Sequence, residues 1–211
     1  MATASTAEEH LRVIRSLMEK ATVYRAISAP TALLGGILGI VASTVVHFQS
    51  RNGGSANKWF LISWLAALAL AGVGNAYFLR ADAHRRGEAF ISSGMRAAMK
   101  ALWPSYLVAT VITILWRNDA ALLPIPWILL YGLSLLSTQH FAPRSISVLG
   151  WSFIIGGLLE LCGSYPFGAD SDALLLQGNL AMGVTFGGFH LIYAVCVWPR
   201  RDAVPSVVSA S

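Results

Sequence analysis

Charged residues are scarce in this chain of 211 residues, where they make up only 12% of the sequence. A soluble domain carries about 25%, so the composition argues against an ordinary water-soluble domain and indicates a protein embedded in lipid. The mean hydropathy of +0.61 agrees with this interpretation. Lys and Arg outnumber Asp and Glu by 15 to 10. Because the basic residues lie beside apolar runs, we expect the lipid bilayer and its anionic headgroups as partners, and no nucleic acid.

Cysteine is nearly absent, and both copies, Cys162 and Cys196, lie inside apolar runs. This argues against a disulfide framework and a cysteine metal site. The sequence also lacks a nucleophile elbow, a zinc-protease helix and a phosphate-binding loop. The histidines fall at different depths of the predicted spans, so no pair is placed to ligate a haem. We therefore expect no cofactor and no metal. The sequence favours a non-enzymatic role and leaves a lipid-modifying enzyme as a third choice after the two roles below.

Long apolar runs are what the chain has in abundance. Six of them can cross a bilayer as helices of about 20 residues, over residues 28–49, 59–79, 101–116, 122–141 and 145–166, with a sixth that ends at Pro199. We predict an all-α fold, a polytopic membrane protein built as a compact bundle of six transmembrane helices over residues 26–199. An N-terminal amphipathic surface helix over residues 1–25 precedes the bundle, and a disordered cytoplasmic tail over residues 200–211 follows it.

The N-terminal segment has an amphipathic pattern. Thr6 and Glu9 have the spacing of a capping box, and Leu11, Ile14 and Leu17 recur at helical spacing. The pattern favours two placements equally, a helix on the membrane surface or against a partner, and a lid packed against the bundle.

Basic residues also predict the topology. The two tails, the connection over residues 80–100 and the fourth connection hold twelve Lys and Arg, whereas the connections on the other side hold three. The positive-inside rule then places both termini in the cytoplasm, and we expect a multi-pass protein of a bacterial inner membrane. All seven tryptophans lie within several residues of a predicted span end, which predicts that they form aromatic belts at the membrane interfaces.

One carboxylate stands out, because Glu160 is the only acidic residue in the interior of any predicted span. An ionisable residue within a membrane is a functional-site hypothesis, since burying its charge in hydrocarbon is costly. By depth, Thr185 is expected opposite Glu160, whereas His190 is offset by roughly 9 Å along the membrane normal. These three residues and Asn179 make up the predicted intramembrane polar site. Glu160 is then either a proton or cation site, or a protonated side chain that hydrogen-bonds a neighbouring helix.

Glycine pairs recur in the first, fifth and sixth spans, and small residues let helices approach closely. The predicted packing faces contain Gly35, Gly36, Gly39, Gly156, Gly157, Gly187 and Gly188. They either pack inside the chain or offer a contact to a second copy or another membrane protein. A further alternative is a discontinuous helix that opens a substrate site.

Arginines of the connection over residues 80–100 form a second candidate site, which comprises Arg80, Arg85, Arg86 and Arg96. They are candidates for contact with an anion or a lipid headgroup. The alternative is that they serve only as the positive-inside determinant.

The function that these patterns favour is transport or sensing of a small solute or ion, with proton coupling through Glu160 as one form of it. The alternative is a non-catalytic structural or assembly subunit of a larger membrane complex or homo-oligomer. A transporter predicts a water-accessible cavity that reaches Glu160, whereas an assembly subunit predicts a glycine-lined outer face and a Glu160 that is sealed between helices.

Overall fold

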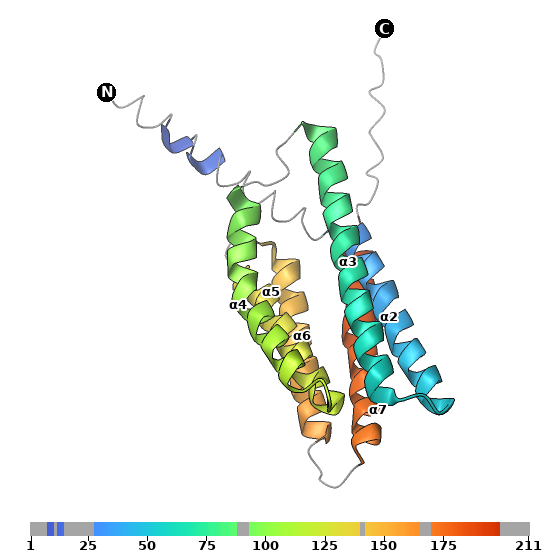
Figure 1. Ribbon diagram of the computed structural model, residues 1–211. Helices are drawn as coiled ribbons and strands as arrows, with labels where there is room; N and C mark the ends of the chain where they lie inside the picture. Colours follow the sequence, from blue (N-terminus) through green and yellow to red (C-terminus); the bar gives the residue numbers. More distant parts are fainter. Residues whose placement is uncertain are drawn as a thin grey trace.

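The computed structural model describes residues 8–10, 12–14, 28–87, 93–139, 142–164 and 170–198. Regular secondary structure in these ranges is entirely helical, and six helices are long and apolar enough to cross a membrane. The predicted all-α bundle of six spans is thereby confirmed (Figure 1). The first five spans are α2 (Ala29–Arg51), α3 (Ala56–Arg86), α4 (Ser93–Leu115), α5 (Pro124–Ser137) and α6 (Arg144–Ser164), with a 3-10 helix η1 (Ala120–Leu122) before α5. The sixth span is continuous and consists of α7 (Ser171–Met182), η2 (Gly183–Phe189) and α8 (His190–Val197).

Little of the predicted N-terminal helix falls within these ranges. Residues 8–10 and 12–14 are helical and exposed. The rest of that helix and the predicted tail over residues 200–211 lie outside the described residues.

The second span extends past its predicted end at residue 79. α3 continues to Arg86 and has 31 residues, or ~46 Å at 1.5 Å per residue, against a hydrocarbon core of ~30 Å. Residues 80–86 contain no helix breaker, and the residue that follows, Gly87, ends the helix with φ 66°. Since α4 begins at Ser93, much of the predicted polar connection is helix.

The fourth span is shorter than predicted. α5 begins at Pro124, as expected for a proline in a first turn, and ends at Ser137, a few residues before its predicted end. At that point the Thr138 hydroxyl donates to the Leu135 carbonyl at 2.7 Å. Local side-chain bonds of this kind compete with the helical pattern and favour its termination.

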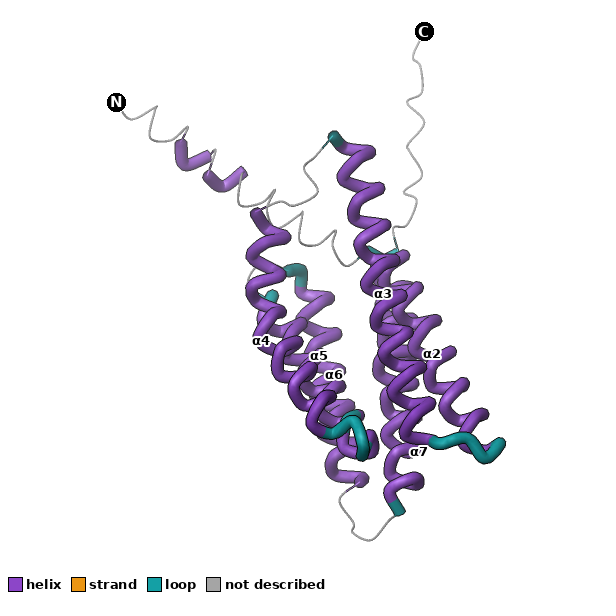
Figure 2. Tube along the Cα trace, in the orientation of Figure 1, coloured by secondary structure: helices purple, strands orange, loops and turns teal. Residues whose placement is uncertain are grey.

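The spans fall into two groups (Figures 1 and 2). In the first group, α2 packs against α3 and against the sixth span. In the second group, α5 packs against α4 and α6. The groups meet where α5 and α6 contact the sixth span.

Glycines allow the closest approach in the first group. A Cβ built on Gly39 would lie 2.8 Å from the backbone nitrogen of Gly187, and one built on Gly187 would lie 2.6 Å from Ile40 Cδ1. α2 and η2 therefore touch nearly backbone to backbone, which only small residues permit.

Aromatic rings fill the region where the two groups meet. Phe186 of η2 lies between Trp64 of α3 and Tyr131 of α5, with ring centroids 5.8 and 5.0 Å away. Phe153 of α6 is fully buried and lies edge-on to Phe186 at 5.0 Å. Tilted and edge-on rings at these distances attract one another beyond the burial of their surface.

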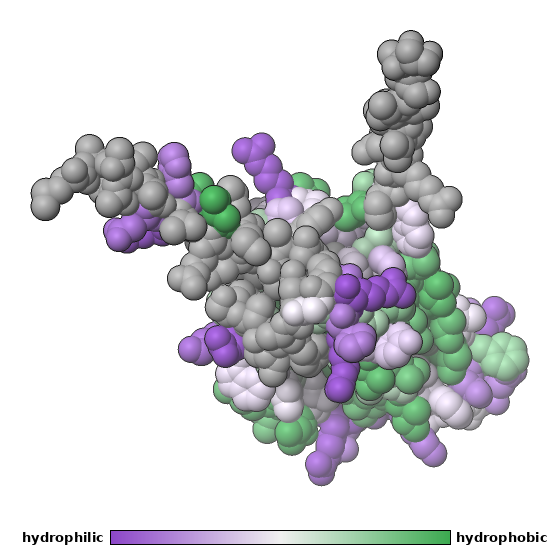
Figure 3. Space-filling model, turned by 90° about the horizontal axis from the view of Figure 1, so that it is seen from above, coloured by the Kyte–Doolittle hydropathy of each residue, from purple (hydrophilic) through white to green (hydrophobic). Residues whose placement is uncertain are grey.

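α3 and α4 face each other across an open edge of the bundle. Although consecutive in the sequence, they hardly touch along their described residues. One link joins α3 to the turn after α4, where Asn57 Nδ2 donates to the Arg117 carbonyl at 3.0 Å and Asn57 Oδ1 accepts from the Ala120 N–H at 2.6 Å. Only 11% of the α3 span and 6% of the α4 span is buried, against 39% for α2. Exposed apolar side chains on both helices, such as Leu68 of α3 and Val111 of α4, indicate that this edge faces lipid. Figure 3 shows that apolar side chains are common on the flanks of the molecule.

Candidate functional site: a cavity at the open edge

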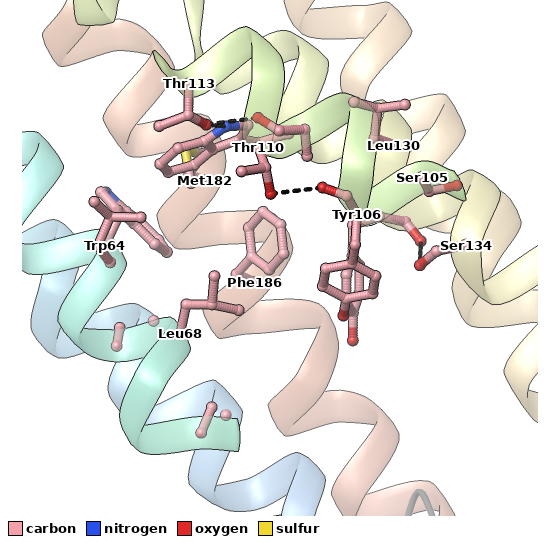
Figure 4. Close-up of a pocket in the computed structure, with 18 of the residues that line it drawn as sticks. Trp64, Leu68, Ser105, Tyr106, Thr110, Thr113, Leu130, Ser134, Met182 and Phe186 are labelled. Atoms are coloured by element: carbon pink, nitrogen blue, oxygen red, sulfur yellow. Dashed lines mark hydrogen bonds between the residues drawn. The ribbon is translucent and has the colours of Figure 1, made fainter. Parts of the chain in front are cut away.

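A cavity of about 430 Å³ lies between the two groups of spans (Figure 4). Its described lining comes from α2, α3, α4, α5 and the sixth span, and α6 contributes none of it. Trp64 and Leu68 approach from α3, Tyr106 and Thr110 approach from α4, and Phe186 lies between them. The volume falls within the range of about 300–1,000 Å³ that is typical of small-molecule sites.

The open edge gives this cavity its entrance. Leu65 and Leu68 of α3 and Tyr106 and Ile114 of α4 line the cavity and are exposed. Because both helices are apolar spans with little of their surface buried, the opening between them meets hydrocarbon instead of water. The opening of the cavity is therefore lined mainly by apolar side chains.

The sixth span departs from α-helical geometry where it lines the cavity. Gly183–Phe189 is a π-helical segment, and such segments are rare and frequently occur at functional sites. Its three glycines are poor α-helix formers. Met182 just before the segment, Phe186 within it and His190 just after it all line the cavity.

His190 is buried, and both nitrogens of its ring have partners. Nδ1 lies 2.9 Å from the Phe186 carbonyl of the same span, and Nε2 lies 2.8 Å from Oη of Tyr131 on α5. A carbonyl only accepts, so Nδ1 carries the proton. In the neutral imidazole Nε2 is then the acceptor, and the Tyr131 hydroxyl donates to it. The hydrogen-bond partners thus assign the tautomer of His190.

Several other polar groups of the wall direct their protons into the protein. Thr110, Thr113 and Ser134 each donate a hydroxyl proton to a backbone carbonyl of their own helix, at 2.7–2.8 Å. The Trp127 indole N–H donates to Thr113 Oγ1 at 2.9 Å. These donors are satisfied, so the groups present oxygen lone pairs, not protons, to the cavity.

A buried cluster of Asn179, Ser43 and Trp64 ties α7 to α2 and α3. Asn179 Oδ1 accepts from the Trp64 indole at 2.9 Å, and Nδ2 donates to the Ser43 carbonyl at 3.0 Å. The Ser43 hydroxyl in turn donates to the Asn179 carbonyl at 3.1 Å. Both polar atoms of the Asn179 amide are satisfied, so this cluster holds helices together and offers no group to a ligand.

The same cluster corrects the predicted aromatic belts. Trp64 is 5% exposed and lies inside the bundle, because its N–H finds a buried acceptor there. Trp127, which bonds Thr113 of α4, lines the cavity. Distance from a span end does not distinguish such tryptophans from interfacial ones.

The predicted polar site is spread over separate places. Glu160 lies near the end of α6, is partly exposed and does not line the cavity. Thr185 packs against α6 one turn earlier, where its Cγ2 would lie 3.0 Å from a Cβ on Gly156. Asn179 belongs to the buried cluster. Of the four residues, only His190 lines the cavity.

Five of the seven predicted packing glycines make close contacts with another helix of this chain, namely Gly36, Gly39, Gly156, Gly157 and Gly187. Gly35 lies at the cavity wall, with His190 Cδ2 4.0 Å from the position of its Cβ, and Gly188 has open space there. The close contacts therefore account for these five glycines within one copy of the chain.

The predicted arginines lie away from the cavity. Arg80 and Arg85 are exposed towards the end of α3, Arg86 is its last residue, and Arg96 is exposed in the first turn of α4. The end of α3 and the start of α4 lie at the same end of the bundle (Figure 1). No group of three or more His, Cys, Asp or Glu side chains is arranged to hold a metal ion within the described part of the chain.

Sequence reasoning missed Tyr131 and the cavity itself. Tyr131 lies in the run WILLYGLSLL, where an aromatic residue has the appearance of ordinary core. The one available signal was its hydroxyl in mid-span, which must find a partner in a bilayer.

Comparisons with protein-family models, with curated proteins and with solved structures found no match. The geometry of the cavity is therefore the basis for assigning a function.

Proposed function

We propose that this integral membrane protein binds a neutral, lipid-soluble small molecule in the cavity, as a sensor or transporter of that molecule. The observation that carries the proposal is the cavity of about 430 Å³ whose entrance lies between α3 and α4. An entrance between two lipid-facing helices admits what dissolves in the bilayer and excludes what does not.

The chemistry of the wall supports a neutral occupant. No Asp, Glu, Lys or Arg is among the residues described as lining the cavity, and His190 has two neutral partners. An ion would lose its hydration there without meeting an opposite charge, and the free-energy cost of that loss is large.

Transport of an ion centred on Glu160 has less support, because Glu160 does not line the cavity. Binding in the cavity and ion transport through Glu160 predict different results for one variant. If the cavity is the binding site, Glu160→Gln leaves ligand binding unchanged, whereas a Glu160-centred mechanism loses it.

Binding is measured as ligand-induced stabilisation of the purified protein in detergent. A molecule that binds only the folded state raises the melting temperature in a concentration-dependent manner. Hexadecanol is a suitable probe, since it is neutral and partitions into apolar phases. We expect it to raise the melting temperature of the natural protein.

Two neighbouring positions on α4 provide a matched pair of variants. Ala109 lines the cavity, whereas Val108 is exposed and does not line it. Ala109→Trp fills the cavity and should remove the stabilisation by hexadecanol, while Val108→Trp should retain it. Equal stabilisation of both variants would show that the alcohol acts elsewhere, and the alternative role as a structural or assembly subunit would then be favoured.

A further inference from the structure

We infer that the cavity selects, among lipid-soluble molecules, those that donate a hydrogen bond, and thus takes a long-chain alcohol in preference to an ether, ester or ketone of the same size. This inference rests on the proposed function and specifies the chemistry of its ligand.

The N–H groups of the wall are already committed to partners within the protein. The Trp64 indole donates to Asn179 at 2.9 Å, and the Trp127 indole donates to Thr113 at 2.9 Å. His190 Nδ1 donates to the carbonyl of Phe186 at 2.9 Å. A ligand carbonyl or ether oxygen that reached these groups would have to break an existing bond, so it would gain little.

Four of the hydroxyl protons of the wall are committed in the same way. Those of Thr110, Thr113 and Ser134 go to carbonyls of their own helices. That of Tyr131 goes to Nε2 of His190 at 2.8 Å. The assignment requires a neutral imidazole, and burial beside two neutral partners provides it, since a buried charge is costly without an opposite charge.

What Tyr131 still offers is a lone pair on its phenol oxygen. A phenol both donates and accepts, and the bond to His190 uses only the proton. A ligand hydroxyl that donates to Tyr131 Oη would continue a chain of three hydrogen bonds, through Tyr131 to His190 and on to the Phe186 carbonyl. Chains of this kind strengthen one another in a low-dielectric interior.

Tyr106 of the same wall does not provide this selectivity. Its hydroxyl lies close to that of Tyr131. Among the described residues no hydrogen bond holds this hydroxyl or that of Ser105, which also lines the cavity, so both hydroxyls can either donate or accept. Three other hydroxyl oxygens of the wall can also accept a hydrogen bond, namely those of Thr110, Thr113 and Ser134. Only the Tyr131 acceptor continues the buried chain to His190, so we assign the larger part of the selection to Tyr131.

The test compares two ligands with one chain length, hexadecanol and its methyl ether, on the natural protein. Their dissociation constants come from the concentration dependence of the melting temperature. We expect hexadecanol to bind roughly two- to tenfold more tightly, which is the value of one hydrogen bond. In Tyr131→Phe the binding of hexadecanol should weaken towards that of the ether. In Tyr77→Phe, a change at an exposed position outside the cavity, the preference should persist.

Each outcome bears on one of the two proposals. If both ligands stabilise the natural protein equally, the cavity binds lipid-soluble molecules but the selection for a donor is wrong. A preference that is as large in Tyr131→Phe as in the natural protein would also overturn the inference. If neither ligand stabilises the protein, the proposed function fails and the inference fails with it. Because the two ligands are first compared on the natural protein, equal stabilisation by both would overturn the inference whether or not Tyr131→Phe folds.

Discussion

The imidazole of His190 and the hydroxyl of Tyr131 lie 2.8 Å apart in the cavity wall and join the sixth span to α5. This bond crosses between the two groups of spans, next to a π-helical segment. A ligand that binds at Tyr131 therefore acts on an atom that already links the groups. Under the proposed function, we expect occupancy to change the balance of contacts that hold the groups together, as a sensor or a transporter requires.

The strength of that bond is measurable by a double-mutant cycle. His190→Leu leaves the Tyr131 hydroxyl without its acceptor in a buried place, so it should destabilise the protein more than Tyr131→Phe does. The free energy of unfolding of the double variant should fall by less than the sum of the decreases in the two single variants. We expect a coupling energy of roughly 0.5–1.5 kcal/mol. Denaturant unfolding in mixed micelles gives the free energies of unfolding of the natural protein, the two single variants and the double variant. Strict additivity would mean that the two side chains do not interact.

We expect a larger loss of stability when the buried cluster of Asn179, Ser43 and Trp64 is disrupted. Asn179→Ala removes both amide partners and leaves the Trp64 N–H unsatisfied, which should lower the free energy of unfolding by about 1–3 kcal/mol. Asn75→Ala is the matched control, since Asn75 Oδ1 is buried and has no partner among the described residues. We expect Asn75→Ala to lower the free energy of unfolding by less than about 0.5 kcal/mol. Similar losses at the two positions would contradict the role given to the cluster.

Close packing of α2 against η2 is tested by adding one methyl group. Gly39→Ala places a Cβ 2.8 Å from the nitrogen of Gly187, and we expect a destabilisation of about 1–3 kcal/mol from overpacking. Gly72→Ala adds the same group to α3 where nothing lies within 4 Å. That change should be neutral or stabilise the protein by up to ~1 kcal/mol. The melting temperatures of the two variants test this expectation. If Gly39→Ala is as stable as the natural protein, α2 and η2 can move apart at this position.

Topology is a prediction that the fold leaves open. Twelve basic residues against three predict that both termini and Gly87 are cytoplasmic and that Gly53 is external. Gly53 and Gly87 both lie in turns with positive φ and are suitable insertion points. Reporters for the two compartments at these positions, and after Ser211, should give external activity only at Gly53. An external signal at Gly87 would reverse the topology.

The spans were predictable because composition and length suffice for a membrane helix. The errors lie where local chemistry overrides hydropathy. α3 runs on to Arg86 because residues 80–86 are polar yet compatible with a helix. The apolar run ends where the chain leaves the membrane. The helix itself ends only at a residue such as Gly87, which adopts φ 66°.

The candidate site was less predictable, because it depends on which helices meet. Glu160 was a candidate because it is the only acidic residue in the interior of a predicted span. The presence of a carboxylate does not show which face of α6 carries it. His190 lines the cavity because the π-helical segment and the contact with Tyr131 place it there. Neither feature is visible in hydropathy or spacing. The grouping of the first, second and sixth spans likewise depends on backbone contacts such as that of Gly39 with Gly187.

The central claim is that lipid-soluble molecules enter the cavity between α3 and α4, and photolabelling tests it most directly. The protein is reconstituted in vesicles with a long-chain alcohol that carries a diazirine in its chain, then irradiated and mapped by peptide mass spectrometry. We expect label on cavity-lining residues of both helices, such as Leu68 and Thr113, and its loss from them in Ala109→Trp. Label confined to outward residues such as Val73 and Leu115, unchanged by that substitution, would contradict the claim.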